Sequence, residues 1–145
     1  MSVSKIFNKE AQKQITDAIK AAELNTSGEI RVHIESKCSG DPYMRAAYLF
    51  SNLDMFNTKE RNAVLIYLAY KSKKFAIIGD SGINEKVPAN FWNDTKDMMA
   101  AKFSKGEFTE GISAAIANVG EKLKTYFTYK QDDVNEQSDE ISFGD

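Results

Sequence analysis

Asp80 is the residue whose type and setting most suggest a binding site, because it is an ionisable group in a glycine-rich loop, 79–82, that follows the apolar run 75–78. Glycines allow tight turns and close approach of a ligand to the backbone. Hard cations prefer carboxylate, amide and carbonyl oxygens, and calcium takes roughly six to eight of them. The sequence therefore suggests a Ca²⁺ or Mg²⁺ site at this loop. The candidate metal-binding residues are Asp80, Glu29, Asn84, Asp94 and Asp97.

These acidic residues also have purely structural interpretations. Asp80 can cap a turn. Asp94 and Asp97, spaced i and i+3, can favour the start of a helix electrostatically. No segment matches the calcium-binding loop of an EF-hand. The metal interpretation therefore depends on which loops the fold brings together.

Glu35 and Asp41 form a rival pair of candidate ligands, at the opposite end of the predicted strand that begins with Glu29. Asp41 precedes Pro42, which is typical of an N-cap followed by proline in the first helical turn. Calcium sites often reuse capping loops of this kind. Glu35 and Asp41 are therefore the second choice of metal ligands.

Other reactive residues give weaker signals. His33 and Cys38 are the single histidine and the single cysteine, and a zinc site needs about three or four protein ligands. His33 is therefore interpreted as a surface residue of a strand. A phosphatase would have to use metal-assisted attack of water with Asp80 at its centre. Arg61 could hold a phosphate, but a salt bridge with Asp80 or Glu29 is the favoured interpretation.

Three apolar segments predict the strands that position these residues. Residues 63–70 are apolar on both faces, as in a strand covered by helices on two sides. The polar residues 71–74 form a hairpin turn, and 75–78 form the returning strand. Residues 29–35 alternate apolar and polar, which predicts a strand with one face that is wet or lines a site.

Helical signals surround these strands. Helices are predicted after Asn8, from Asp41, from Pro88 to Gly106, and over about 107–126. The order α-β-α-β-β-α-α predicts a layered α/β sandwich. No linker divides residues 1–129, so they are expected to form one domain.

The handedness of the crossover decides which loops meet. A right-handed βαβ unit makes the first two strands parallel. Segments 26–29, 58–62 and 79–82 would then gather at one end of the sheet. Another crossover would instead bring the Asp80 loop to the end that carries Glu35 and Asp41.

Composition limits the class of protein. The chain has 145 residues, a net charge of −2 and one cysteine. A nucleic-acid binder would normally show a basic face, so no nucleic-acid partner is expected. A single cysteine excludes an intramolecular disulfide and suits a reducing compartment. No apolar run approaches the length of a membrane span, and the first residues lack the apolar stretch of a signal peptide, so a cytoplasmic location is expected.

Residues 130–145 form an acidic C-terminal tail with six carboxylates and one lysine. This composition predicts a mobile segment that could dock on a protein partner. Residues 141–143 are an alternative, since their short apolar pattern could add to a sheet edge.

Several segments in this order resemble the TPM domain family, named for thylakoid phosphatase-like, modulator and membrane-associated relatives. They are TSGEIRVHIE, RNAVLIYLA, FAIIGDSGI, the following FW, and FSKGEFTEGISAAI. The resemblance covers about residues 5–128, and the tail is similar to that of short, free-standing bacterial members. Departures are Ala63, where many relatives have glycine, and the absence of the signal sequence and membrane anchor common in the family.

This resemblance implies a three-layer αβα Rossmann-like sandwich with a small mixed sheet of about four strands. It also implies a divalent cation site in the loops, often for calcium. Acid phosphatase activity is ascribed to plant relatives, whereas other members are accessory or modulatory proteins. The expectation is therefore a stand-alone, metal-responsive binding or regulatory module. The alternative is a metal-dependent acid phosphatase acting on phosphomonoesters.

Overall fold

Strand β2 (Ala63–Ala69) is buried along its whole length and lies inside a four-stranded sheet of order β3-β2-β1-β4. The computed structural model describes residues 6–129 and 136–144. Strand β1 (Glu29–Glu35) is parallel to β2, and β3 (Lys74–Gly79) is antiparallel to it. The mixed sheet and the parallel pairing of β1 with β2 agree with the prediction.

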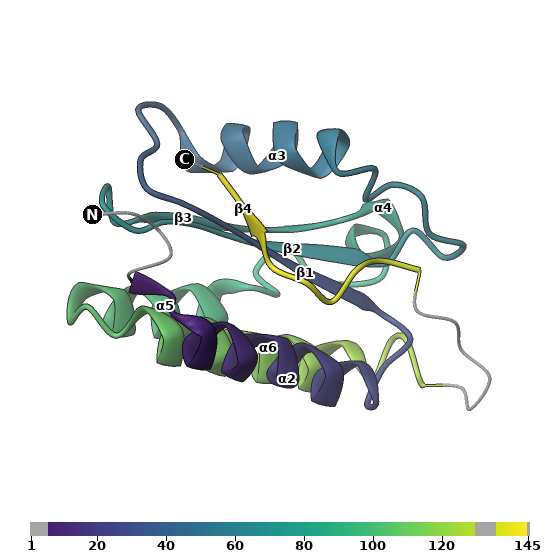
Figure 1. Cartoon of the computed structure of the whole chain (residues 1–145). Helices are drawn as coiled ribbons and strands as arrows, with labels where there is room; N and C mark the ends of the chain where they lie inside the picture. Colours follow the sequence, from purple (N-terminus) through teal and green to yellow (C-terminus); the bar gives the residue numbers. More distant parts are fainter. Residues whose placement is uncertain (1–5, 130–135, 145) are drawn as a thin grey trace.

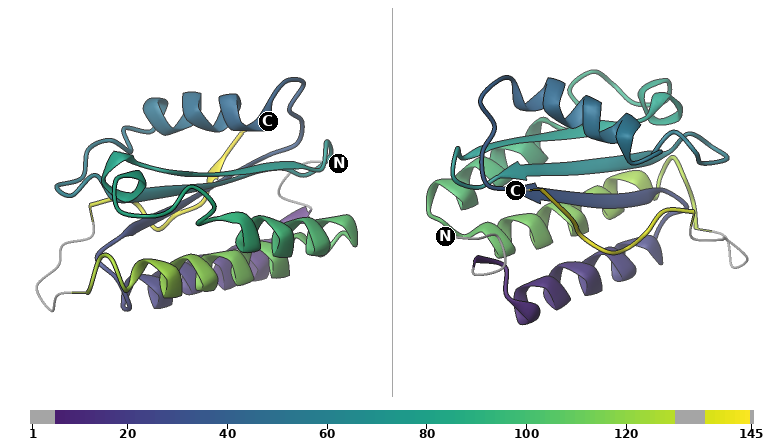
Figure 2. Two further views of the ribbon diagram at one scale, coloured as in Figure 1. Left: turned by 180° about the vertical axis from the view of Figure 1, so that it is seen from behind. Right: turned by 45° about the horizontal axis from the view of Figure 1, so that its top comes forward.

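Helices cover both faces of the sheet (Figure 1). Helix α3 (Pro42–Asn52) lies on one face. Helices α2 (Lys9–Glu23), α5 (Asn93–Ser104) and α6 (Phe108–Leu123) lie on the other. The two further views in Figure 2 show the same three layers. The predicted α/β sandwich is therefore confirmed. None of the helices in the described ranges combines the length and apolar content needed to cross a bilayer.

The two faces of β2 belong to two separate hydrophobic cores. Val64, Ile66 and Leu68 pack in the larger core with α2, α5 and α6. Leu65 and Tyr67 point to the smaller core beneath α3. Alternating side chains of a strand point to opposite faces, so a strand between two helical layers must be apolar at every position.

Capping residues explain two helix starts that the sequence predicts. The Asn8 side chain accepts a hydrogen bond from the Ala11 amide at 2.9 Å, and Asp41 accepts one from the Tyr43 amide at 2.9 Å. Side-chain oxygens at these positions satisfy amides that have no partner within the helix.

The third predicted helix begins later than expected. Hydrogen bonds from Phe91 N–H to the Pro88 carbonyl and from Asn93 N–H to the Asn90 carbonyl, both 3.1 Å, close separate turns before α5. A short helix, α4 (Ser81–Asn84), also follows β3 and was not predicted.

The tail supplies the fourth strand. Strand β4 (Ser142–Phe143) is parallel to β1, and the Gly144 amide donates to the Ile34 carbonyl at 2.8 Å. The expectation of a mobile tail is therefore wrong for residues 136–144, and the alternative of sheet addition is confirmed. Backbone pairing with an open edge depends little on composition, and Ile141 adds apolar contact with the larger core. The rest of the tail lies outside the described residues.

Candidate functional site

The polar segments that were expected to converge do so at the amino-terminal ends of β1 and β2. The Glu29 amide donates to the Asn62 carbonyl at 3.2 Å, and the Asp80 amide donates to the Ala63 carbonyl at 3.0 Å. The register, with Glu29 opposite Ala63 and Gly79 opposite Val64, fixes this end of the sheet. The expectation that segments 26–29, 58–62 and 79–82 gather at one end of the sheet is therefore confirmed.

Asp80 is bound by Arg61 in a two-point ion pair. The Arg61 Nε lies 2.7 Å from Oδ2 of Asp80, and Nη2 lies 2.8 Å from Oδ1. The Ser81 amide also donates to Oδ1 at 2.7 Å, so Asp80 is the N-cap of α4. The carboxylate is buried, and strong donors hold both of its oxygens.

Backbone packing fixes Arg61 beside Asp80. Arg61 has a φ of 52°, in the left-handed region. The Gly82 amide donates to the Arg61 carbonyl at 2.9 Å. A Cβ at Gly82 would lie 2.1 Å from the Glu60 carbonyl oxygen, so glycine is required for this close approach. Gly82 therefore serves chain packing, whereas the sequence alone allowed close approach of either a ligand or the backbone.

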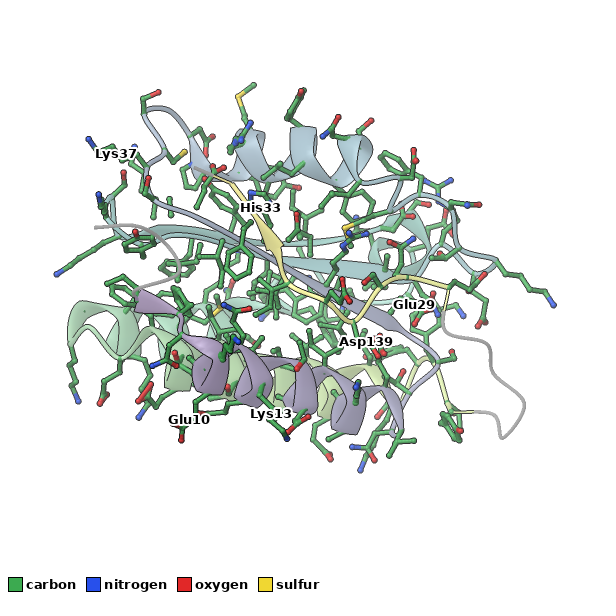
Figure 3. The ribbon with its side chains drawn as sticks, viewed as in Figure 1. Glu10, Lys13, Glu29, His33, Lys37 and Asp139 are labelled. Carbon is green, nitrogen blue, oxygen red and sulfur yellow. The ribbon has the colours of Figure 1, made fainter. Side chains whose placement is uncertain are left out.

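Glu29 belongs to a group of carboxyls that holds the tail. Its Oε1 accepts hydrogen bonds from the backbone amides of Glu136 and Gln137. Glu23 accepts a hydrogen bond from the Ile30 amide at 3.1 Å and also bonds to the side chain of Asp139. Figure 3 shows Glu29 and Asp139 at the same end of the sheet.

Burial raises the pKa values of Glu29 and Glu23 in this group. Desolvation raises the pKa of Glu29. Desolvation, followed by the hydrogen bond with Asp139, raises the pKa of Glu23 to about 10. A carboxyl that keeps its proton near neutral pH is a hydrogen-bond donor and a poor cation ligand.

The other first-choice ligands serve different contacts. The Asn84 side-chain amide donates to the Gly79 carbonyl at 3.0 Å. Asp94 pairs with Lys122 at 2.8 Å, which lowers the pKa of Asp94. Asp97 is exposed. Within residues 6–129 and 136–144, no group of three or more His, Cys, Asp or Glu residues is arranged to hold a metal ion.

Glu35 forms a second buried cluster at the other end of β1. Arg45 donates from Nε to Oε2 at 2.9 Å and from Nη2 to Oε1 at 2.8 Å. The Tyr67 hydroxyl donates to Oε2, and His33 Nε2 lies 3.2 Å from Oε1. A carboxylate has about four lone-pair positions, so this set leaves none open.

The cluster shifts the pKa of its members in opposite directions. Burial alone would raise the pKa of Glu35, but hydrogen bonds from Arg45, Tyr67 and His33 lower it to about 2. Burial lowers the pKa of His33. Burial, followed by the bond to Glu35, raises the pKa of Tyr67.

His33 is buried, so its interpretation as a surface residue is wrong. Its Nδ1 lies 2.9 Å from the Ser142 hydroxyl, because β4 covers this part of β1. The polar face of β1 is therefore mostly buried and not wet, and the alternative that it lines a site stays a prediction. Sequence reasoning missed Tyr67 and Arg45 as partners of Glu35. The available signal for Tyr67 was a hydroxyl in an otherwise apolar strand.

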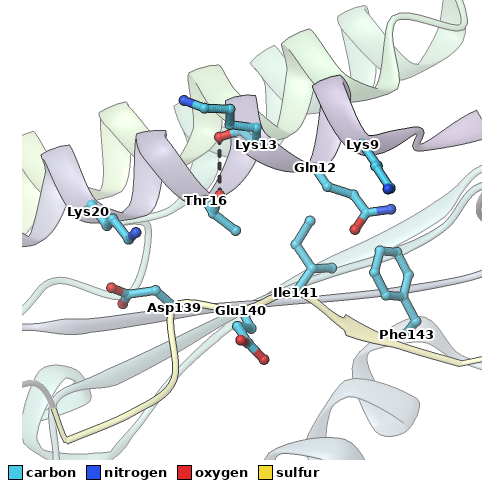
Figure 4. A pocket seen from close by; sticks show the side chains of 9 residues that line it. All are labelled: Lys9, Gln12, Lys13, Thr16, Lys20, Asp139, Glu140, Ile141 and Phe143. Atoms are coloured by element: carbon cyan, nitrogen blue, oxygen red, sulfur yellow. Dashed lines mark hydrogen bonds between the residues drawn. The ribbon is translucent and has the colours of Figure 1, made fainter.

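Two surface depressions lie near these clusters. One, of about 670 Å³, contains both Glu35 and Asp41 and lies beside the loop from β1 to α3. The other, of about 470 Å³, separates α2 from the tail. In Figure 4, Lys20 of α2 faces Asp139 across this groove, and Ile141 and Phe143 lie along its tail side.

Comparison with known proteins agrees with this arrangement. The model of the TPM domain matches residues 2–122. The chain belongs to the TPM family. BA42 from the psychrophilic bacterium Bizionia argentinensis shares 46% sequence identity with this TPM domain. Its NMR structure gives a TM-score of 0.87, and the match covers 93% of each chain. No protein with a curated description matches the chain.

A more distant structure shares the fold alone. The N-terminal domain of cg2496 from Corynebacterium glutamicum is 15% identical to this TPM domain, with a TM-score of 0.67. The similarity covers 84% of this chain and 77% of the other. The layered α/β arrangement is therefore retained where little sequence identity remains.

Proposed function

We propose that this TPM domain is a non-enzymatic binding module that recruits another protein. The main support is that its buried carboxylates are already bound within the chain. Asp80 is held by Arg61, Glu29 by the tail amides and Glu35 by Arg45. Metal-assisted hydrolysis needs open ligands for the cation and an open position for water. Asp80, Glu29 and Glu35 are therefore better explained as residues that stabilise the fold.

A turnover assay tests this proposal against the phosphatase alternative. The protein is incubated with p-nitrophenyl phosphate from pH 4.5 to 8, with Mg²⁺ or Ca²⁺ present. We expect no release of p-nitrophenol above the buffer rate. Saturable turnover that Asp80→Asn abolishes, while circular dichroism shows a folded protein, would contradict the binding-module proposal.

A divalent cation response is a second candidate, supported by one observation. Asp41 is exposed and shares a depression with Glu35 and the Gly40 region at the carboxyl ends of the parallel strands. Ligands of open α/β sheets often bind at this end. A cation there would compete with Arg45 for Glu35. We therefore expect weak calcium binding, with a Kd of roughly 10⁻⁴ to 10⁻³ M.

An NMR amide titration with CaCl₂, and then with MgCl₂, tests the cation response. Saturable shifts centred on residues 35–41 support binding at this depression, and shifts centred on 79–84 support the Asp80 loop instead. Asp41→Asn should weaken the first set of shifts, and Asp97→Asn is the matched control. The absence of saturable shifts up to about 10 mM metal would contradict a metal response, since known calcium modules saturate below this range.

A further inference from the structure

The carboxyl ends of the parallel strands carry a cluster of positive charge. It consists of Lys37, the turn residues Lys71 and Lys73, and Lys74 at the start of β3, which together we name the cationic end. In the described part of the chain, none of these lysines forms an ion pair. The whole chain has a net charge of −2, so this positive cluster reflects segregation of charge.

Hydrogen bonds join the two segments that carry these lysines. The Lys71 amide donates to the Ser36 carbonyl at 2.8 Å, and the Lys74 ammonium donates to the Gly40 carbonyl at 2.9 Å. The Cys38 amide donates to the Ser72 hydroxyl at 3.0 Å. The hairpin turn and the loop from β1 to α3 therefore form one continuous surface.

Helix α3 presents an unusual set of exposed side chains next to this surface. Tyr43, Met44 and Tyr48 are 55%, 70% and 60% exposed, and we name them the aromatic face. The helix already buries its other face in the smaller core. Arg45 lies over the Tyr48 ring, 5.5 Å from its centroid, and so connects this face with the Glu35 cluster.

The depression of about 670 Å³ adjoins both sets: Lys37 of the cationic end and Met44 of the aromatic face line it. Lys37 belongs to the loop after β1, and Met44 and Arg45 belong to α3. Figure 3 shows Lys37 at the end of the molecule where α3 begins. Asp41 is the exposed acid in this lining, and Glu35 is neutralised by Arg45. The charges that line the depression are therefore balanced, and the excess positive charge of this surface comes from Lys71, Lys73 and Lys74 on the adjoining hairpin.

We propose that the cationic end and the aromatic face together bind an acidic protein segment that carries an apolar side chain. This inference rests on the proposed binding function and gives it a surface and a partner class. Lysines attract the carboxylates, and the depression accepts the apolar side chain. Tyrosine, methionine and arginine are enriched at protein interfaces. A flat lipid surface would leave the depression unfilled, and membrane-binding helices usually present Trp, Phe or Leu.

An NMR titration with a synthetic peptide tests the proposal. The probe is a dodecapeptide of glutamate with one central phenylalanine, and the control peptide has serine in place of each glutamate. We expect saturable amide shifts at Lys37, across residues 43–48 and across residues 71–74, below about 1 mM peptide. The affinity should fall as NaCl rises, because salt screens exposed charges. The serine peptide should produce no saturable shifts.

Charge-reversal variants separate a specific surface from general attraction. Lys71→Glu/Lys73→Glu should weaken binding by about tenfold or more, because it places like charges against the peptide. Lys96→Glu/Lys105→Glu makes the same change in net charge on α5 and its following turn, and should change affinity by less than about twofold. Tyr48→Ala should also weaken binding. Equal losses in both double variants, or no loss in either, would overturn the proposal.

Two further measurements distinguish other occupants. The first is co-sedimentation with phosphatidylserine vesicles. If the wild-type protein binds the vesicles but not the peptide, and Lys71→Glu/Lys73→Glu abolishes vesicle binding, the partner is a membrane and not a protein. Concentration-dependent self-association that shifts the same amides would replace the acidic partner with a second copy. Phosphomonoester turnover is measured on the same sample. A missing peptide response without turnover overturns this surface alone, whereas turnover overturns the proposed function.

Discussion

At the scale of single residues, the buried carboxylates of Asp80 and Glu35, at opposite ends of the sheet, are each neutralised by one arginine. Asp80 is paired with Arg61, and Glu35 with Arg45, each through two hydrogen bonds. In both pairs the arginine is the more exposed partner. A buried carboxylate without its cation is strongly unfavourable, so the arginines should matter for stability even though they lie near the surface.

Replacing Arg45 with alanine should lower the free energy of unfolding by about 1–3 kcal/mol, because Glu35 keeps only Tyr67 and His33 as donors. Urea denaturation at pH 7 measures this loss. The double variant Arg45→Ala/Glu35→Gln should recover part of it, since the uncompensated charge is removed. Additive losses in the double variant would contradict the role assigned to the pair.

The Glu35 cluster should also make the stability of the fold depend on pH in the acid range. The pKa of Glu35 falls from 4.5 to about 2 on folding. The associated stability is therefore present above the unfolded pKa and is lost as the pH falls from 4.5 toward 2. In Glu35→Gln this part of the acid transition should be absent from the stability profile.

Glu23 should have the opposite dependence on pH. Its pKa rises from 4.5 to about 10 in the folded protein. The contribution of Glu23 to the free energy of unfolding is therefore fully present below pH 4.5 and declines as the pH rises toward 10. Glu23→Gln keeps hydrogen-bonding groups and removes the charge, so it should flatten the decline in urea midpoint from pH 6 to 9. Glu10→Gln is an exposed control on the same helix. An unchanged profile in Glu23→Gln would exclude the proposed titration.

At the scale of elements, β4 determines how the polar side of β1 behaves. It places Ser142 against His33 and leaves both His33 and Glu35 buried. A truncation that removes residues 141–145 should raise the pKa of His33 toward its ordinary 6.5, because burial is the main cause of its lowering. The NMR shift of the imidazole Cε1 proton against pH measures the change. A pKa of His33 that stays where it is in the full chain would show that β4 is not the cover.

Local patterns predicted most of the elements correctly. Alternation in 29–35 and the caps Asn8 and Asp41 depend on neighbouring residues, and the structure agrees with them. The start of α5 was less predictable, because Pro88 can begin either a helix or a turn. The meeting of three loops at the amino-terminal ends of β1 and β2 was also predicted correctly. The parallel pairing that it requires follows from the handedness of βαβ crossovers, which is nearly invariant.

The site could not be predicted to the same depth, because its decisive contacts join residues distant in sequence. Gln137 to Glu29 and Ser142 to His33 are separated by 108 and 109 residues. No local pattern reports such pairs. The special role predicted for the glycines around Asp80 holds for Gly82, but only the geometry shows that Gly82 makes room for the Glu60 carbonyl.

At the scale of the whole molecule, β2 joins two cores that would otherwise be independent. Its alternate side chains pack beneath α3 and against α2, α5 and α6. Damage to the smaller core should therefore unfold the larger one. Phe50→Ala should lower the free energy of unfolding by about 3–5 kcal/mol. Fluorescence of Trp92, in the other core, should report the same urea midpoint as circular dichroism. Separate midpoints would show that the cores unfold independently.

The position of β4 in the chain also sets an order of events during synthesis. Strand β1 leaves the ribosome long before the tail exists, and Ser142 follows His33 by 109 residues. Helices and the hairpin can form early, but the outer backbone groups of β1 lack their β4 partner until residues 142–143 have been synthesised. Uncovered strand edges are templates for association with other chains. The nascent protein therefore passes through a stage in which the outer edge of β1 stays open to other chains until Ser142 and Phe143 pair with it.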